Sequence, residues 1–133
     1  MNPTPGTVGP LERLNSFINE SPTICEKAGT NIDAPAHKAV MYDDDGNVVL
    51  ATSGEKAIGV ILSSSPDPII KGSQVNILIS CIGLLEAGGE IKKGDYVTIN
   101  SAGQGVVAEE NDHVFGRAFT KSGNAGEVIQ IQI

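Results

Sequence analysis

The sequence repeats itself once, and this repeat limits the possible folds more than any other feature of the chain. A shift of 57 positions without a gap places Val40 on Val97, Gly46 on Gly103, Val49 on Val106, Leu50 on Val107, Ala51 on Ala108, Ile58 on Phe115 and Gly59 on Gly116. A shift of 54 continues the match and places Gly72 on Gly126, Val75 on Ile129, Ile77 on Ile131 and Ile79 on Ile133. The two copies cover about residues 34–82 and 91–133.

Each copy has the pattern of a small β-unit, with short apolar runs separated by turn residues. Apolar and polar residues alternate along 75–81 and along 129–133, which predicts strands with one buried face. Asp45-Gly46 predicts a tight hairpin, while Gly59 and Gly116 lie within strands and indicate a bend or bulge. We therefore expect an all-β fold, a compact barrel or sandwich whose two copies face each other about a pseudo-twofold axis.

The same alignment makes predictions about the core and the connection between the copies. Ile77 and Ile131 should be equivalent buried side chains, whereas residues 81–87 should extend the last strand of the first copy before Gly88-Gly89 turns the chain. The chain has 16 Gly, five aromatic residues and no Trp, so Val, Ile, Ala and Leu should form the core.

The first thirty residues do not fit the repeat. Prolines and glycines crowd residues 1–10 and predict an extended arm. Residues 11–20 predict one short amphipathic helix, because their apolar residues recur at spacings of three and four: Leu11, Leu14, Phe17 and Ile18. The helix either packs on its own domain or docks on a neighbouring subunit. We expect residues 1–30 to form an arm with this helix, and residues 31–133 to form the β-domain.

Charge and hydropathy exclude several classes of partner. Sixteen acidic and nine basic side chains give a net charge of −7, which disfavours nucleic acid and anionic membranes. No run approaches the roughly 20 apolar residues of a membrane span, and the N-terminus lacks a signal-peptide pattern. The protein should thus be made and used without export. Cys25 and Cys81 should then be reduced, buried hydrophobic residues, with a disulfide or a reactive thiol as the alternative.

No motif in the chain predicts a catalytic or metal site. A calcium loop beginning at Asp43 would need Gly at its sixth position and Glu at its twelfth, where Val48 and Gly54 stand. Asp43-Asp44-Asp45 therefore predicts a solvated hairpin turn, with a weak ion site as the alternative. Neither His37 nor His113 has the spacing of a metal ligand, and no phosphate loop or nucleophile elbow is present. We expect no cofactor and no metal; an enzyme with a site built from scattered residues stays open.

Four segments of the second copy, IKKGDYV at 91–97, GVV at 105–107, VFGRA at 114–118 and AGEVIQI at 125–131, carry a resemblance to a known family. Together with the first copy they resemble the small capsid decoration (cement) proteins of tailed phages over residues 34–133. The resemblance implies a structural protein, not an enzyme, that lies on the outer capsid surface of the virion and cements neighbouring major-capsid subunits. It also implies self-association, commonly as a homotrimer.

These expectations name partners and a binding element. The partners are the major capsid protein and further copies of the chain, with no nucleic acid and no membrane, and assembly should occur in the host cytoplasm. The residues expected to bind the capsid or a neighbouring subunit are Leu11, Leu14, Phe17 and Ile18. The alternative function is a tail or head-fibre module, or an adhesive carbohydrate-binding β-module.

Overall fold

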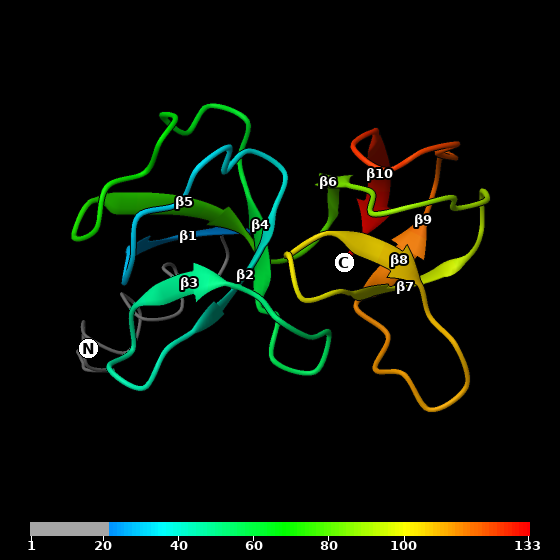
Figure 1. Ribbon diagram of the computed structural model, residues 1–133, viewed down its shortest axis with the longest axis horizontal. Helices are drawn as coiled ribbons and strands as arrows, with labels where there is room; N and C mark the ends of the chain where they lie inside the picture. The colour runs from blue at the N-terminus through cyan, green and yellow to red at the C-terminus, as the bar shows by residue number, and fades with distance from the viewer. Residues whose placement is uncertain (1–21) are drawn as a thin grey trace, which may run out of the picture.

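The computed structural model describes residues 22–133, which form ten β-strands in two five-stranded sheets without a helix in that range (Figure 1). The first sheet contains β1 (Thr23–Lys27), β2 (Ala39–Tyr42), β3 (Val48–Leu50), β4 (Gly59–Ile61) and β5 (Gln74–Leu78). The second contains β6 (Ile82–Glu86), β7 (Tyr96–Ile99), β8 (Gly105–Val107), β9 (Gly116–Ala118) and β10 (Val128–Gln132). We call residues 22–81 the N-terminal unit and residues 82–133 the C-terminal unit. The all-β fold class is confirmed.

The two sheets have the same topology. The strand order β1-β5-β4-β2-β3 recurs as β6-β10-β9-β7-β8, and the ladder pairs are antiparallel in both. The bounds of β7, β8 and β9 are those of β2, β3 and β4 plus 57, and β10 follows β5 at 54. The offsets in the sequence therefore mark equivalent strands, and a further offset of 59 relates β1 to β6.

Each sheet curls so that its two edge strands meet. A parallel bridge joins Ala28, just beyond β1, to Val48 of β3, and its equivalent joins Ala87 to Gly105. The amide of the next residue donates to the same strand in both units, from Gly29 to Val48 and from Gly88 to Gly105, at 2.7 Å each. The chain is thus a pair of small barrel-like units, each closed by its own edges, instead of one barrel shared by the two copies.

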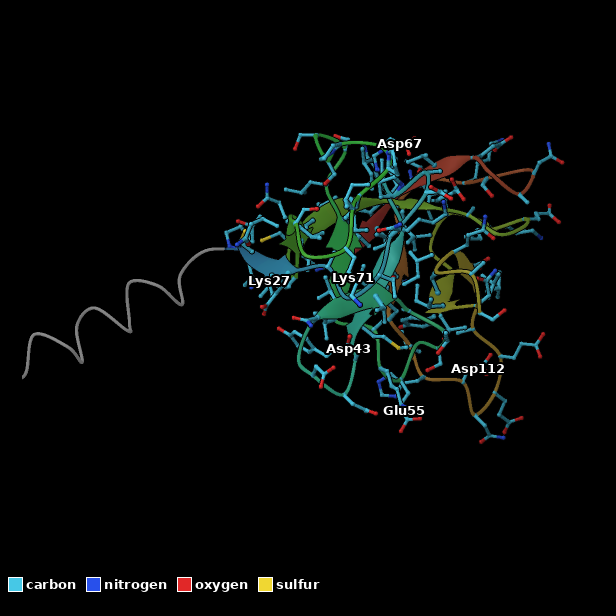
Figure 2. The ribbon with its side chains drawn as sticks, turned by 60° about the vertical axis from the view of Figure 1, so that its left-hand side comes forward. Lys27, Asp43, Glu55, Asp67, Lys71 and Asp112 are labelled. Carbon is cyan, nitrogen blue, oxygen red and sulfur yellow. The ribbon has the colours of Figure 1, made fainter. Side chains whose placement is uncertain are left out.

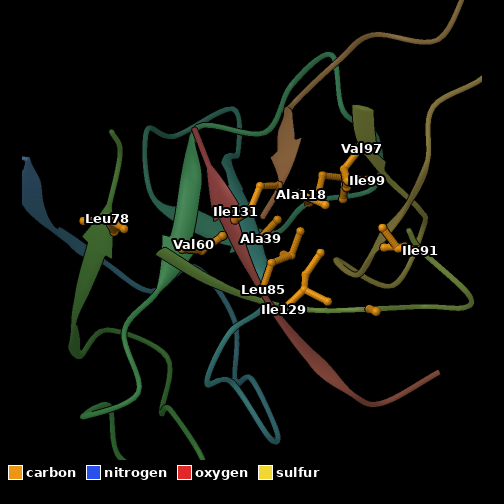
Figure 3. Close-up of a cluster of buried hydrophobic side chains, with 12 residues drawn as sticks. Ala39, Val60, Leu78, Leu85, Ile91, Val97, Ile99, Ala118, Ile129 and Ile131 are labelled. Carbon is orange, nitrogen blue, oxygen red and sulfur yellow. The ribbon is translucent and has the colours of Figure 1, made fainter. Parts of the chain in front are cut away.

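Two groups of buried side chains form the core. One lies within the N-terminal unit and consists of Ala28, Ile32, Val40, Val48, Ile61, Ile69, Val75 and Ile77. The other fills the C-terminal unit and also includes four residues on the outer side of the first sheet, namely Ala39, Ala51, Val60 and Leu78 (Figure 3). Ile77 and Ile131 are both fully buried, as predicted. Because the second core draws on both units, they are packed together as well as connected.

Two strands differ from the sequence prediction. Residues 1–30 were assigned to the arm, but β1 pairs with β5 along its whole length and belongs to the first sheet. Residues 81–87 were expected to extend the preceding strand; instead β5 ends at Leu78, the chain turns through Cys81 with φ of 73°, and β6 starts the second sheet. The helix predicted over residues 11–20 lies outside the described residues.

Gly59 and Gly116 begin β4 and β9, and close approach of backbone explains both. A Cβ on Gly59 would overlap the carbonyl oxygen of Leu78 and lie 2.8 Å from Ile77 Cγ2. A Cβ on Gly116 would overlap the carbonyl oxygen of Gln132 in the same way. The glycines therefore let neighbouring strands pack closely, which is one of the roles glycine has within strands.

Candidate interaction surface

The residues singled out for chemistry are dispersed over the described part of the chain. Cys25 and Cys81 are free and exposed, so their predicted burial was wrong. Cys25 lies on the outward side of β1, where its thiol donates to Gln74 Oε1 at 2.9 Å, and Cys81 lies in the connection between the units. Within residues 22–133 no three His, Cys, Asp or Glu side chains gather as a metal site requires.

The acidic run is a hairpin turn. Asp43 Oδ1 accepts the amides of Asp45 and Asn47, both at 2.9 Å. In the second copy Asn100 Oδ1 accepts the amides of Ala102 and Gln104 in the same arrangement. An uncharged Asn thus makes the same turn, so the carboxylate of Asp43 has a structural use that requires no ion.

The two units meet in a junction held by backbone and side-chain contacts. The Glu86 amide donates to the His37 carbonyl, and the Ala39 amide donates to the Gly103 carbonyl, both at 2.8 Å. Lys38, which is 9% exposed, places its Nζ 3.3 Å from Glu86 Oε2. This ion pair is largely shielded from water, where removing one partner costs more than at an open surface.

Two hollows lie where the units meet. The smaller, about 220 Å³, is mostly apolar and is lined by His37, Val60, Ile61, Leu62, Ser63, Leu78, Ile82, Gly83 and Leu84. The larger, about 500 Å³, is open and lined by Ser53, Gly54, Glu55, Thr98, Ile99, Asn111, Asp112 and His113. Neither combines a nucleophile with a base at hydrogen-bonding distance among the contacts of the described residues, which is the arrangement that nucleophilic catalysis needs.

Three exposed apolar side chains share the outer side of β6 and β10. Ile82, Leu84 and Val128 are 55%, 41% and 43% exposed on it, and their neighbours include Gln130 and Gln132. We call these five residues the β6–β10 face. Exposed apolar groups that cluster on one face mark interaction sites, whereas isolated ones do not.

The first copy lacks this face. The equivalents of Ile82, Leu84 and Val128 in the N-terminal unit are Thr23, Cys25 and Gln74, all less apolar. The face was not predicted from the sequence, because residues 81–87 were expected to extend the preceding strand. A comparison of the copies at offset 59 was the signal that would have found it.

Further exposed apolar residues lie at the two ends of the molecule. Tyr96, Val107 and Val114 are exposed in the C-terminal unit, and the Arg117 guanidinium lies 5.3 Å from the centre of the Tyr96 ring. At the other end Tyr42, 43% exposed, donates from its hydroxyl to Glu26 Oε2 at 2.5 Å. This hydrogen bond, with partial burial and the Glu26 charge, raises the pKa of Tyr42.

Leu11, Leu14, Phe17 and Ile18, the residues predicted to bind a partner, lie outside the described residues. No helix within residues 22–133 has the length and apolar character needed to cross a membrane.

Comparison with known proteins identifies a structure of the same fold and a family. A crystal structure described as the head fiber gp8.5 N base in bacteriophage phi29 shares the fold, with a TM-score of 0.66 and 24% identity over 84% of this chain and 92% of that one. No curated protein matches. The model of the structural cement protein family (E217 gp24/Pam3 gp6) matches residues 1–133, the whole chain. The chain therefore belongs to the phage structural cement protein family.

Proposed function

We propose that this structural protein of the virion lies on the outer surface of a phage capsid and bridges neighbouring major-capsid subunits through its β6–β10 face. The observation that carries the proposal is that face, whose Ile82, Leu84 and Val128 are exposed on a closely packed body and have polar or small counterparts in the other copy. A net charge of −7 favours the outer surface, because an acidic protein is repelled by packaged DNA.

The N-terminal arm would supply a second attachment. Leu11, Leu14, Phe17 and Ile18 form an apolar stripe in the sequence that a capsid groove or an adjacent subunit would cover. Burial of four such side chains contributes about 6–12 kcal/mol before the cost of ordering the arm is subtracted. The net gain per chain is small, and many copies on one lattice would make it sufficient.

Self-association would multiply these contacts. We take the unit on the capsid to be a homotrimer, assembled in the host cytoplasm before or during attachment. Three copies bound together dissociate far more slowly than one copy with the same contacts, because each released copy is held near its site. The role is structural, and it needs neither a cofactor nor a metal.

The test replaces the three apolar residues of the face together: Ile82→Thr and Val128→Gln introduce the residues at the equivalent positions, and Leu84→Ser introduces a serine in place of the equivalent Cys25. The matched control is Ile70→Thr, a residue equally exposed at 55% on the N-terminal unit. We expect the triple variant to fold normally by circular dichroism and to bind undecorated capsids about 10- to 100-fold more weakly, since each half-exposed side chain contributes on the order of 1 kcal/mol. The control should bind like the unchanged protein.

A chain lacking residues 1–20 tests the arm separately. It should keep the β-fold and be lost from capsids at lower temperature than the full chain. If both the triple variant and the shortened chain decorate and protect capsids fully, attachment through these two elements is wrong.

A second function, the base of a head fibre, is favoured by one observation, the likeness of fold to the phi29 head fiber base. Cryo-EM of particles reconstituted with this chain separates the two. A cement protein gives density that lies flat across subunit boundaries, whereas a fibre base gives density centred on one site with an axis pointing away from the capsid.

A further inference from the structure

The junction between the two units is not reciprocal. Gly103, in the turn between β7 and β8, is buried against Ala39, whereas its equivalent Gly46 is exposed and a Cβ there would meet nothing within 4 Å. A twofold relation would require Gly46 to contact Tyr96, the equivalent of Ala39. In Figure 1 the turn between β7 and β8 points toward the N-terminal unit, and the turn between β2 and β3 points away from the C-terminal unit.

The units are therefore arranged head to tail. Each unit uses one of two possible contact surfaces in the junction, and its other contact surface stays free. In the junction, the N-terminal unit supplies what we call the receiving face, and the C-terminal unit supplies what we call the docking face. The free receiving face is the equivalent surface of the C-terminal unit, around Tyr96. The free docking face is the equivalent surface of the N-terminal unit, around Gly46. A contact between unlike surfaces can be repeated from molecule to molecule, and it forms a ring when the rotation closes.

The free receiving face has residues suited to a protein interface. The covered pair Ala39 and Val60, 0% and 1% exposed, corresponds to the neighbouring pair Tyr96 and Arg117, which is exposed. Tyr and Arg are enriched at protein interfaces. Val107, exposed by 40%, corresponds to Leu50, whose side chain the Gly103 turn approaches in the junction.

The free docking face, like the free receiving face, has an exposed aromatic residue where the junction has a buried apolar one. Tyr42 is 43% exposed at the position where the junction holds Ile99 at 4%. Figure 2 shows Lys27 and Asp43 on this unit. Three of the exposed large apolar or aromatic residues, Tyr42, Tyr96 and Val107, thus lie on the two free faces.

The two positions equivalent to the junction's ion pair also carry opposite charges, but the positive and the negative residue have changed places. Lys38 of the N-terminal unit pairs with Glu86 of the C-terminal unit at 3.3 Å. The equivalent of Lys38 is Asp95, and the equivalent of Glu86 is Lys27. A second contact of the same geometry would therefore bring Lys27 of one chain to Asp95 of another, a cation again meeting an anion.

The neighbouring turns are also complementary. Asp44 and Asp45 are exposed beside Gly46 on the free docking face, and their equivalents Ser101 and Ala102 are exposed beside Gly103 at the edge of the junction. Lys92 and Lys93 are exposed beside Gly94, the residue equivalent to His37 of the junction. Opposite charge on two facing patches steers association and selects the partner.

We propose that copies of this chain bind each other head to tail, with the Gly46 turn and Lys27 of one chain docking on Tyr96 and Asp95 of the next as the Gly103 turn and Glu86 dock within each chain. The contact, repeated around the trimer proposed above, leaves no free end. The partner is a second copy of the chain. This inference rests on the self-association proposed above and is independent of attachment to the capsid.

A cross-linking experiment tests the contact in the full-length chain. In a background of Cys25→Ser and Cys81→Ser, Lys27→Cys with Asp95→Cys should be joined by a short bismaleimide into covalent oligomers, because these positions meet only between chains. The matched control, Lys38→Cys with Glu86→Cys, should react within one chain and keep the monomer mass. A control that reacts while the first pair stays monomeric overturns the proposal.

Charge exchange provides a second test by sedimentation. Lys27→Glu and Asp95→Lys should each weaken self-association roughly tenfold, as loss of an interfacial charge pair does, and the two together should restore it. Lys121→Glu, an exposed lysine of the C-terminal unit whose equivalent, Pro68, has no contact in the junction, should change nothing. Asp95 also accepts the Lys92 amide at 2.9 Å, so circular dichroism must show that the Asp95 variant is folded, and Lys27→Glu tests the contact without that complication.

Two further results would overturn the inference. One is an unchanged protein that stays monomeric up to its solubility limit. The other is single variants that both weaken association while the double variant fails to recover it. Either result leaves the capsid binding of the β6–β10 face unaffected, so the two proposals fail separately.

Discussion

Substitution of Gly59 or Gly116 by alanine should destabilise the protein, and by similar amounts. The added Cβ would overlap a backbone carbonyl oxygen, of Leu78 in one case and Gln132 in the other. It would also crowd the fully buried Ile77 or Ile131. A backbone atom cannot rotate away as a side chain can, so the neighbouring strand must shift.

The magnitude follows from two opposing effects. Forcing extra volume into a packed interior costs about 1–3 kcal/mol, while alanine lowers the entropy of the unfolded chain and returns about 0.4–1 kcal/mol. The net loss should be about 0.5–2.5 kcal/mol, which lowers the melting temperature of a chain this size by roughly 2–10 °C.

The control for this prediction is Gly89→Ala. A Cβ at Gly89 would meet nothing within 4 Å, and its φ is not positive. This variant should be as stable as the unchanged protein or slightly more stable. Thermal unfolding followed by circular dichroism measures all three. The explanation by close strand approach is refuted if Gly59→Ala and Gly116→Ala melt with the control.

Three further predictions concern the core, the acidic turn and Tyr42. Ile77→Ala and Ile131→Ala should each lower the free energy of unfolding by about 2–5 kcal/mol in denaturant titrations, because both side chains are fully buried; a loss below 1 kcal/mol would contradict their burial. Calcium or a chelator should leave the melting temperature unchanged, since Asp43 already accepts two turn amides, and an upward shift of several degrees with calcium would show an ion site. Tyr42→Phe should cost about 0.5–1.5 kcal/mol by loss of the bond to Glu26. Because the folded pKa of Tyr42 is raised, its contribution is complete below the unfolded pKa near 10 and is lost as the pH rises through the folded value; an equal decline of the Phe variant above pH 10 would contradict this.

The strands that recur at offsets 57 and 54 were predictable because local signals agree there. Their apolar residues alternate, and glycine with Asp or Asn marks the turns, so pattern and turn chemistry indicate the same elements. β1 was not predicted because only Ile24 and Glu26 point inward from it, and its stability comes from pairing with β5, far along the chain. The match of Ala28-Gly29 and Ile32 to Ala87-Gly88 and Ile91 at offset 59 was the overlooked signal.

The interaction surfaces were less predictable than the fold. Ile82 and Leu84 are two residues apart, so the sequence shows that they share one side of a strand. Whether the other unit covers that side depends on how the two units pack, which the sequence does not show. The exposure of Cys25 has the same origin, because it lies on the outward side of β1, which the C-terminal unit does not cover. The relation between the units, head to tail instead of twofold, depends on contacts between residues far apart in the sequence, such as that of Gly103 with Ala39.

The short connection between β5 and β6 has a mechanical consequence. Three residues, 79–81, join the units. The hydrogen bonds of Glu86 with His37 and of Ala39 with Gly103 also hold the two units together. A few connecting residues can act as a hinge, but here the shared core and these hydrogen bonds oppose a change of angle between the units. If the chain bridges two capsid subunits as proposed above, it should therefore resist bending and transmit tension between them when the capsid swells.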